Sequence, residues 1–179
     1  MAGFAALTRG FMRSRSPLGL GVRTALAHLW FALNFFLAFP ALVLYAAGVS
    51  LRPPPGALAV LGAAIIVIAH VALLALLVAF VRNGRGTQAP LDPPREFVSR
   101  GLYRFVRNPM YLLYVGIVLG EASLYRSRAL LVYALGFWLL THAYVVGVEE
   151  PALTRRFGAA YAEYCRRVGR WLPRLRAPD

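Results

Sequence analysis

The stretch Arg100–Gly116, RGLYRFVRNPMYLLYVG, sets arginines, tyrosines and a proline directly before an apolar run. Asn108 followed by Pro109 is typical of a helix start, because asparagine can cap free N–H groups and proline needs no partner at the first helical position. From Pro109 the apolar run reaches Leu124, which is roughly 24 Å of helix at about 1.5 Å per residue. Since the hydrocarbon core of a bilayer is ~30 Å thick, this short helix is expected to begin below the headgroups.

Two arginines of this stretch, Arg104 and Arg107, would then lie in a partly dehydrated pocket at the inner membrane face. They would share it with a helix N-terminus, which carries free N–H groups and a partial positive charge. The alternative is an interfacial belt of tyrosine and arginine that only anchors a transmembrane helix. Composition alone does not separate the two interpretations.

The composition indicates an integral membrane protein. Of 179 residues, 59% are hydrophobic and 15% are charged, and the net charge is +13. No nucleic-acid partner is expected, because the arginines lie at the ends of long apolar runs and not on a face interleaved with aromatic residues. The expected partners are the lipid bilayer and its anionic headgroups. The single cysteine, Cys165, excludes an internal disulfide and a multi-cysteine metal site, and no metal is expected.

The hydropathy pattern predicts one all-α membrane domain with about four transmembrane helices and a C-terminal amphipathic helix. The predicted segments are residues 1–23, a basic N-terminal segment; residues 24–81, a two-helix hairpin; residues 82–108, a cytoplasmic loop; residues 109–148, a second two-helix hairpin; and residues 149–179, a C-terminal segment at the cofactor site. The four spans are expected at residues 24–48, 57–81, 109–124 and 129–148.

The run Glu149-Glu150-Pro151 is expected to end the fourth span, with Glu150 capping a new helix over residues 152–168. An amphipathic helix of this kind is expected to lie on the cytoplasmic face or to pack over the pocket. Its apolar residues recur every three or four positions and so form one helical stripe: Leu153, Phe157, Tyr161, Tyr164 and Val168.

The arginine distribution predicts the orientation in the membrane. Seventeen of the twenty arginines fall in the N-terminal segment, the central loop and the tail after Glu150, against three in the opposite loops. This is a positive-inside pattern. Both termini, the central loop and the paired glutamates are therefore expected on the cytoplasmic side.

The adjacent carboxylates Glu149 and Glu150 are costly at the end of a membrane helix, because like charges repel and dehydration penalises both. Neighbours on a helix point about 100° apart, so one could face the bundle and a ligand while the other meets Arg104, Arg107 or Arg155. His142 lies two turns before Glu149 on the same face and could line the same cavity. The alternative is that both glutamates cap the next helix and bind surface arginines.

Taken together, these segments resemble a known superfamily. GLYRFVRNPMYLLYVG, followed by EEPALTRRFGAAYAEYCRRVGRWLPR, resembles the isoprenylcysteine carboxyl methyltransferase and phospholipid methyltransferase superfamily of integral membrane enzymes. GRGTQAPLDPPREFVSRG looks like the loop of its small bacterial members. The resemblance covers about half the chain. It implies methyl transfer from S-adenosylmethionine, bound on the cytoplasmic side, to a lipophilic or lipidated substrate, in a protein of the bacterial inner membrane.

The superfamily's arginine-histidine-proline-x-tyrosine pattern falls on Arg107, Asn108, Pro109 and Tyr111, and its paired glutamates on Glu149 and Glu150. Asn108 is a departure, because the usual residue there is a histidine associated with cofactor binding. Asparagine can donate and accept hydrogen bonds but carries no charge. A role as an acid or a cation is therefore excluded at this position.

The cofactor combines a sulfonium, an ammonium, a carboxylate and ribose hydroxyls. Glu149 or Glu150 can accept from its ammonium or ribose, whereas Arg107 and the first free N–H groups of the helix can hold its carboxylate. Tyrosines can pack around the adenine or the sulfonium. The expected cofactor-binding residues are Tyr103, Arg107, Asn108, Pro109, Met110, Tyr111, His142, Glu149, Glu150 and Tyr161.

Arg104 and Glu150 are the expected catalytic residues, Arg104 by holding an anionic acceptor. The resemblance favours carboxyl methylation of an isoprenylcysteine-type substrate, with methylation of a phospholipid or other amine as the alternative. A non-catalytic membrane protein that keeps the fold for binding or assembly also stays open. Outside the site, His70 is expected to be a packing histidine, and Gly116 with Gly120 a close-packing pair. The sequence does not predict the oligomeric state.

Overall fold

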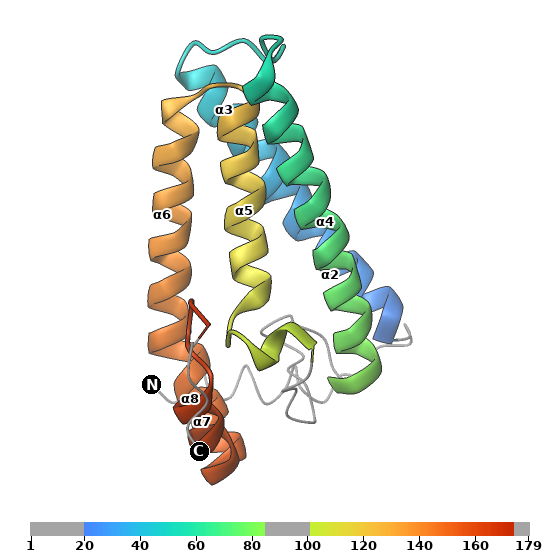
Figure 1. The fold of residues 1–179 in the computed structure, drawn as a ribbon, viewed down its shortest axis with the longest axis vertical. Coiled ribbons are helices and arrows are strands. Elements are labelled where there is room, and N and C mark those ends of the chain that lie inside the picture. Colours follow the sequence, from blue (N-terminus) through green and yellow to red (C-terminus); the bar gives the residue numbers. More distant parts are fainter. Residues whose placement is uncertain (1–19, 85–100, 174–179) are drawn as a thin grey trace, which may run out of the picture.

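The computed structural model describes residues 20–84 and 101–173, which form a bundle of helices (Figure 1). The elements are α2 (Leu20–Leu33), the π-helical turn η1 (Asn34–Ala38), α3 (Phe39–Ala46), α4 (Ala57–Gly84), the short 3-10 helix η2 (Gly101–Arg104), α5 (Pro109–Leu124), α6 (Arg128–Tyr144), the π-helical turn η3 (Val145–Glu149), α7 (Glu150–Phe157) and α8 (Ala159–Arg167). The predicted basic N-terminal segment and most of the predicted central loop lie outside the described residues.

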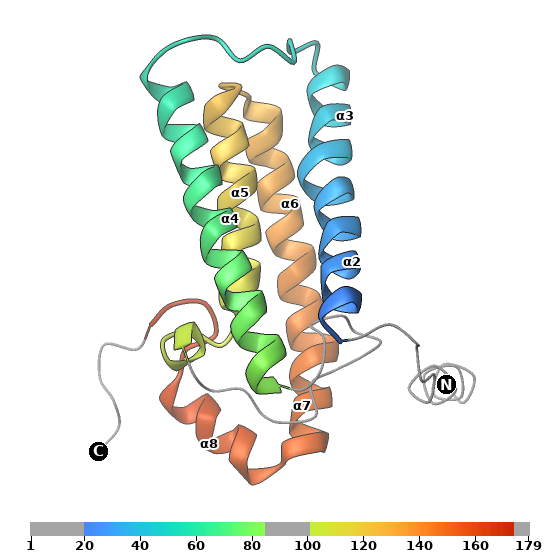
Figure 2. The same cartoon turned by 90° about the vertical axis from the view of Figure 1, so that its right-hand side faces the viewer.

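Four rods lie side by side: α2 continued by α3, then α4, α5, and α6 continued by α7 (Figure 2). Three helices are long and apolar enough to cross a membrane, over Thr24–Ala46, Ala57–Ala79 and Arg128–Phe157. The apolar helix α5 is shorter, at Pro109–Leu124, with the bounds that the sequence predicted. The structure therefore confirms the all-α membrane architecture.

Two prolines, Pro40 and Pro151, lie inside long helices, and a π-helical turn precedes each of them. In these turns the N–H groups of Phe39 and Glu150 reach back five residues to a carbonyl oxygen. Proline removes a donor and crowds the preceding turn, and the wider π turn accommodates both effects. The prediction that the fourth span ends at the paired glutamates is therefore wrong, because the helix continues to Phe157.

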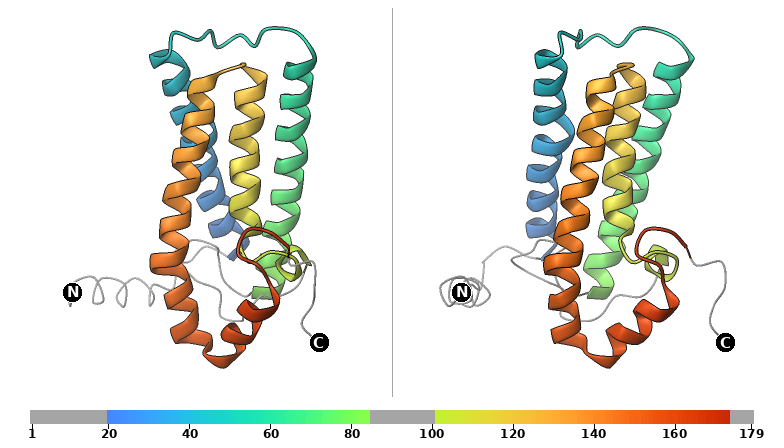
Figure 3. Two further views of the ribbon diagram at one scale, coloured as in Figure 1. Left: turned by 60° about the vertical axis from the view of Figure 1, so that its left-hand side comes forward. Right: turned by 90° about the vertical axis from the view of Figure 1, so that its left-hand side faces the viewer.

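The predicted continuous helix over residues 152–168 is also wrong, because Gly158 separates α7 from α8. Its φ of +52° is a conformation that favours glycine, and α8 turns back toward the bundle there (Figure 3). The predicted apolar stripe nevertheless forms one cluster across the bend, in which Tyr161, Tyr164 and Val168 are buried against partly buried neighbours that include Leu153 and Phe157.

Helices α4 and α5 approach each other closely at Gly62 and Gly120. A Cβ atom built on Gly62 would lie 2.5 Å from the Gly120 carbonyl oxygen, so any side chain would force the helices apart. Small residues allow such contacts between membrane helices. Half of the predicted glycine pair is confirmed, because Gly120 makes the contact whereas Gly116 faces open space.

Candidate active site

The chain before α5 and the chain after α8 pair with each other at one end of the bundle. Val106 and Gly169 form a short parallel bridge, in which the Arg107 N–H donates to the Gly169 carbonyl oxygen at 2.8 Å. Residues 168–171 are called the strap below. The bridge brings the strap, the N-terminus of α5 and the junction of α6 with α7 together, although they are distant in sequence.

Asn108 holds the strap with its side chain. It occupies the N-cap position of α5, ahead of Pro109, but its side chain caps no helix N–H. Its Nδ2 instead donates to the Arg170 carbonyl oxygen at 3.2 Å, and the residue is buried. The predicted helix start is thus correct and the predicted capping bond is wrong. A neutral amide is sufficient for the contact that is observed.

The Glu150 carboxylate is bound by two arginines. Arg170 donates from Nε to Oε1 at 2.7 Å and from Nη2 to Oε2 at 2.9 Å, which is the bidentate geometry that guanidinium and carboxylate favour. The Arg107 Nη1 lies 3.2 Å from Oε1, and the Arg107 and Glu150 side chains are only 11% and 17% exposed. Hydrogen bonding to Glu150 raises the pKa of Arg170. Glu150 therefore ties the strap to the membrane helix.

Glu149 has a different environment from its neighbour. Tyr111 donates its O–H to Glu149 Oε2 at 2.9 Å, and the phenols of Tyr103 and Tyr144 lie within electrostatic range. Within residues 20–84 and 101–173, no arginine forms an ion pair with this carboxylate. Burial raises the pKa of Tyr103 and the Glu149 carboxylate raises it further, so this phenol stays neutral. Glu149 is thus an acidic group in a tyrosine-rich surround without a cation.

Arg107 has a buried donor without a partner. Its Nη1 contacts Glu150 Oε1 and also donates to Cys165 Sγ at 2.7 Å, but its buried Nε has no hydrogen-bond partner. A buried donor without an acceptor costs about 1–3 kcal/mol. This end of the bundle therefore contains a buried donor without an acceptor in addition to the acid Glu149.

His142 is covered by the strap. Trp171 Nε1 donates to His142 Nδ1 at 2.9 Å, so that nitrogen is the acceptor of this bond. Trp138 stacks on the same imidazole with ring centroids 5.6 Å apart. The predicted proximity of His142 to the glutamates is supported by its electrostatic interaction with Glu150.

Most of the sequence-predicted cofactor residues lie at this end of the bundle, on α5, on the α6–α7 junction and on α8. Tyr161 is buried and interacts electrostatically with Glu150 and Arg107. Met110 is buried in the main core. Arg104 is exposed at the end of η2 and is not part of the ion-pair cluster.

Sequence reasoning missed the contacts of Arg170, Trp171 and Cys165. All three fall within the C-terminal stretch that carried the resemblance, but no spacing in it indicated that the strap folds back onto α5. Tyr164 adds a further tie, because its O–H donates to the Tyr103 carbonyl oxygen at 2.7 Å.

A bundle of long apolar helices with a partly buried cluster of charged side chains at one end is the architecture of an integral membrane protein. The family model described as phospholipid methyltransferase matches residues 57–160, which is more than half of the chain. The chain therefore belongs to the phospholipid methyltransferase family, as the sequence resemblance implied, and is a membrane methyltransferase that requires a methyl donor. No curated protein matches the chain.

The matched residues cover α4 to the start of α8 and include Arg107, Glu149 and Glu150. The strap and the first membrane rod lie outside the match. The two glutamates and the arginine are thus part of the family region, whereas Arg170 and Trp171 extend the site beyond it.

Proposed function

We propose that the protein transfers a methyl group from S-adenosylmethionine to the carboxylate of a lipophilic acceptor. Two observations at this end of the bundle carry the proposal. Among the described residues no arginine forms an ion pair with Glu149, and the buried Arg107 Nε has no hydrogen-bond partner. The cofactor is a zwitterion with an additional sulfonium, so its amino-acid part needs one acidic and one basic contact. Both kinds of group are present, and the residues fit the cofactor.

Each group at the site has a role in this proposal. Glu149 accepts from the ammonium or the ribose, and Tyr103 and Tyr111 supply aromatic walls for the sulfonium, a cation–π contact. Arg107 and the free N–H groups at Met110 and Tyr111 hold the carboxylate. Glu150 does not contact the cofactor but positions Arg107 and the strap.

The cofactor supplies an electrophilic methyl group, and its transfer is an in-line displacement that depends on positioning more than on proton transfer. A carboxylate acceptor needs no base. This agrees with the contacts at the site, since Glu150 is bound by two arginines and His142 by Trp171. Arg104, exposed beside Tyr103, is the proposed contact for the anionic acceptor.

Methylation of an amine headgroup is the second candidate, and the family description favours it. A protonated amine must first lose a proton, and Glu149 is the group at the site that could accept it. A third possibility is a non-catalytic binding or assembly role. The arginine-rich end of the chain supports placing the site and both termini on the cytoplasmic side of a bacterial inner membrane.

The test is calorimetric titration of the detergent-purified protein with S-adenosylhomocysteine. We expect micromolar-range binding that weakens at least about tenfold in Glu149→Gln, the effect of losing one charge-assisted contact of about 1.5–3 kcal/mol. Glu163→Gln, at an exposed glutamate of α8, is the matched control. A folded wild-type protein without any binding would instead support the non-catalytic role.

A further inference from the structure

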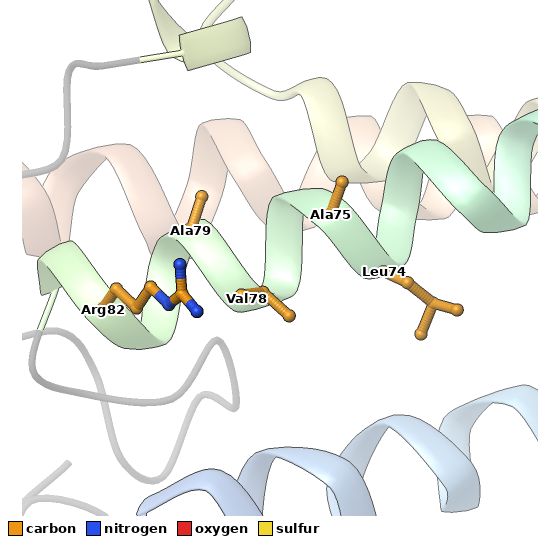
Figure 4. Close-up of a pocket in the computed structure, with 5 residues that line it drawn as sticks. All are labelled: Leu74, Ala75, Val78, Ala79 and Arg82. Atoms are coloured by element: carbon orange, nitrogen blue, oxygen red, sulfur yellow. The ribbon is translucent and has the colours of Figure 1, made fainter.

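Arg82 and Glu121 lie on apolar helices outside the candidate active site, and their surroundings differ. Arg82, in the last turn of α4, is exposed. Together with four apolar residues of the same helix it lines an open pocket of about 610 Å³ (Figure 4): Leu74, Ala75, Val78 and Ala79. A long arginine side chain near a helix end can reach the membrane surface. The shorter side chain of Glu121 on α5 is enclosed instead, because the residue is only 8% exposed.

Glu121 lies in the last turn of α5, whereas the candidate active site lies at the N-terminus of that helix (Figure 1). The residue that follows it belongs to a small apolar cluster that joins α3, α5 and α6: Leu44, Ala122 and Leu130. Both loops at this end of the bundle, residues 47–56 and 125–127, are described in full. The surroundings of Glu121 are therefore complete in the structure.

The Glu121 carboxylate has no polar partner among the described residues. Its Oε2 is buried and accepts no hydrogen bond, and no arginine forms an ion pair with it. The Tyr133 phenol of α6 lies within electrostatic range, but it donates its O–H to the Phe35 carbonyl oxygen at 3.1 Å. The other titratable groups of the elements at this end form no hydrogen bond or ion pair with it: Tyr45, Arg52, Tyr125, Arg126 and Arg128.

An enclosed carboxylate of this kind is costly in its charged form. Burial of an isolated ionised carboxylate in apolar surroundings costs so much free energy that the group takes up a proton instead. A metal cation would need several ligands. No group of three histidine, cysteine, aspartate or glutamate side chains that could hold a metal ion occurs in the described part of the chain. The proton is therefore the cation that fits this position.

We infer that Glu121 is a proton-binding site: the folded bundle holds it as the neutral carboxylic acid, and loss of the proton loosens the packing of α5 against α3 and α6. The inference is independent of the proposed methyl transfer. In the unfolded chain the same carboxyl group is ionised above about pH 5. The folded state therefore binds one proton more than the unfolded state, and the free energy of unfolding falls as the pH rises.

Thermal unfolding of the full-length protein in detergent between pH 5.5 and pH 8.5, values on the order of neutral pH, tests this inference. Glu121→Gln keeps the size of the side chain and is neutral throughout. We expect its melting temperature to rise relative to the wild type by about 3–5 °C for each pH unit over which Glu121 stays protonated, which is about tenfold in the folding equilibrium per pH unit. Glu163→Gln, at an exposed glutamate of α8, is the matched control and should keep a constant difference from the wild type.

A difference between Glu121→Gln and the wild type that does not change with pH would overturn the inference. If Glu121→Gln does not fold, Glu121→Met provides an apolar side chain of similar length for the same comparison.

Infrared spectroscopy in a detergent without carbonyl groups gives a second readout. At neutral pH the wild type should show the carbonyl stretch of a neutral carboxylic acid, and this band should be lost in Glu121→Met. Glu149 is present in both proteins, so its contribution cancels in the difference spectrum. A difference spectrum that shows loss of an ionised carboxylate instead would overturn the inference.

Discussion

The two adjacent glutamates have separate roles because they face different partners. Glu150 is bound bidentately by Arg170 and approached by Arg107, whereas Glu149 receives a single hydrogen bond from Tyr111. Successive helical residues point in different directions, so one acid faces the strap and its neighbour faces tyrosines.

Glu150→Ala is expected to loosen the strap and destabilise the protein. Removing one partner of a largely buried ion pair leaves the other charge uncompensated, which costs about 3–5 kcal/mol, and partial exposure of Arg170 places this case at the lower end. The measurements are thermal unfolding in detergent and hydrogen exchange at residues 168–171. Arg166→Gln, which removes an exposed partner of Glu163, should leave both unchanged. Unaltered exchange in Glu150→Ala would contradict the positioning role.

Asn108 acts as a donor to the strap, so the chemistry of the replacement matters more than its size. Asn108→Asp is expected to weaken the strap, because a carboxylate cannot donate to the Arg170 carbonyl oxygen and the buried acceptor loses its partner at a cost of about 1–3 kcal/mol. Asn108→His keeps a ring N–H that can donate and should retain more stability. Thermal unfolding compares the two variants. An equal loss of stability in both variants would show that the hydrogen bond from Asn108 to the Arg170 carbonyl oxygen is unimportant.

At the scale of elements, the bundle is organised by where its helices touch and where they change pitch. The two internal prolines follow π turns, and the second turn contains Glu149, which accepts a hydrogen bond from Tyr111. The α4–α5 contact is set by glycine on both helices. The N-terminus of α5 is part of the candidate site, so this contact helps to position the site.

Gly62→Ala is expected to separate α4 from α5. The added Cβ would lie 2.5 Å from the Gly120 carbonyl oxygen, and overpacking of this kind typically costs about 1–3 kcal/mol. Gly116→Ala, in a position that faces open space, should be tolerated. Thermal unfolding in detergent compares the two variants, and Gly62→Ala should have the lower melting temperature. Similar melting temperatures would contradict the close approach of α4 and α5.

At the scale of the whole molecule, the bundle combines an apolar pocket on α4 with a cluster of charged side chains at one end of its helices. A carboxylate acceptor predicts a methylation rate that is flat above about pH 5–6, because a free carboxyl group has a pKa near 4. An amine acceptor predicts a rate that rises with pH as the ammonium loses its proton. The pH profile at saturating cofactor distinguishes them, and a continued rise through neutral pH would favour the amine.

The sequence determined a large part of this molecule. Long apolar runs predicted the membrane helices, Asn108-Pro109 predicted the start of α5, and the resemblance predicted the family that the comparison with known proteins confirmed. The membrane helices and the start of α5 depend on local hydropathy and local backbone preference, and both can be read from neighbouring residues in the sequence.

Only the tertiary structure decided which partner each residue of the candidate site contacts. The sequence placed Glu149, Glu150 and Arg107 together but did not show that Arg170 returns to bind Glu150, nor that Asn108 holds the strap. It also ended the fourth helix at the paired glutamates, since it gave no sign that a π turn absorbs Pro151. Partners such as Arg170 and Asn108 are far apart in the chain, and their pairing follows from how the bundle brings two polar segments together, which no local pattern encodes.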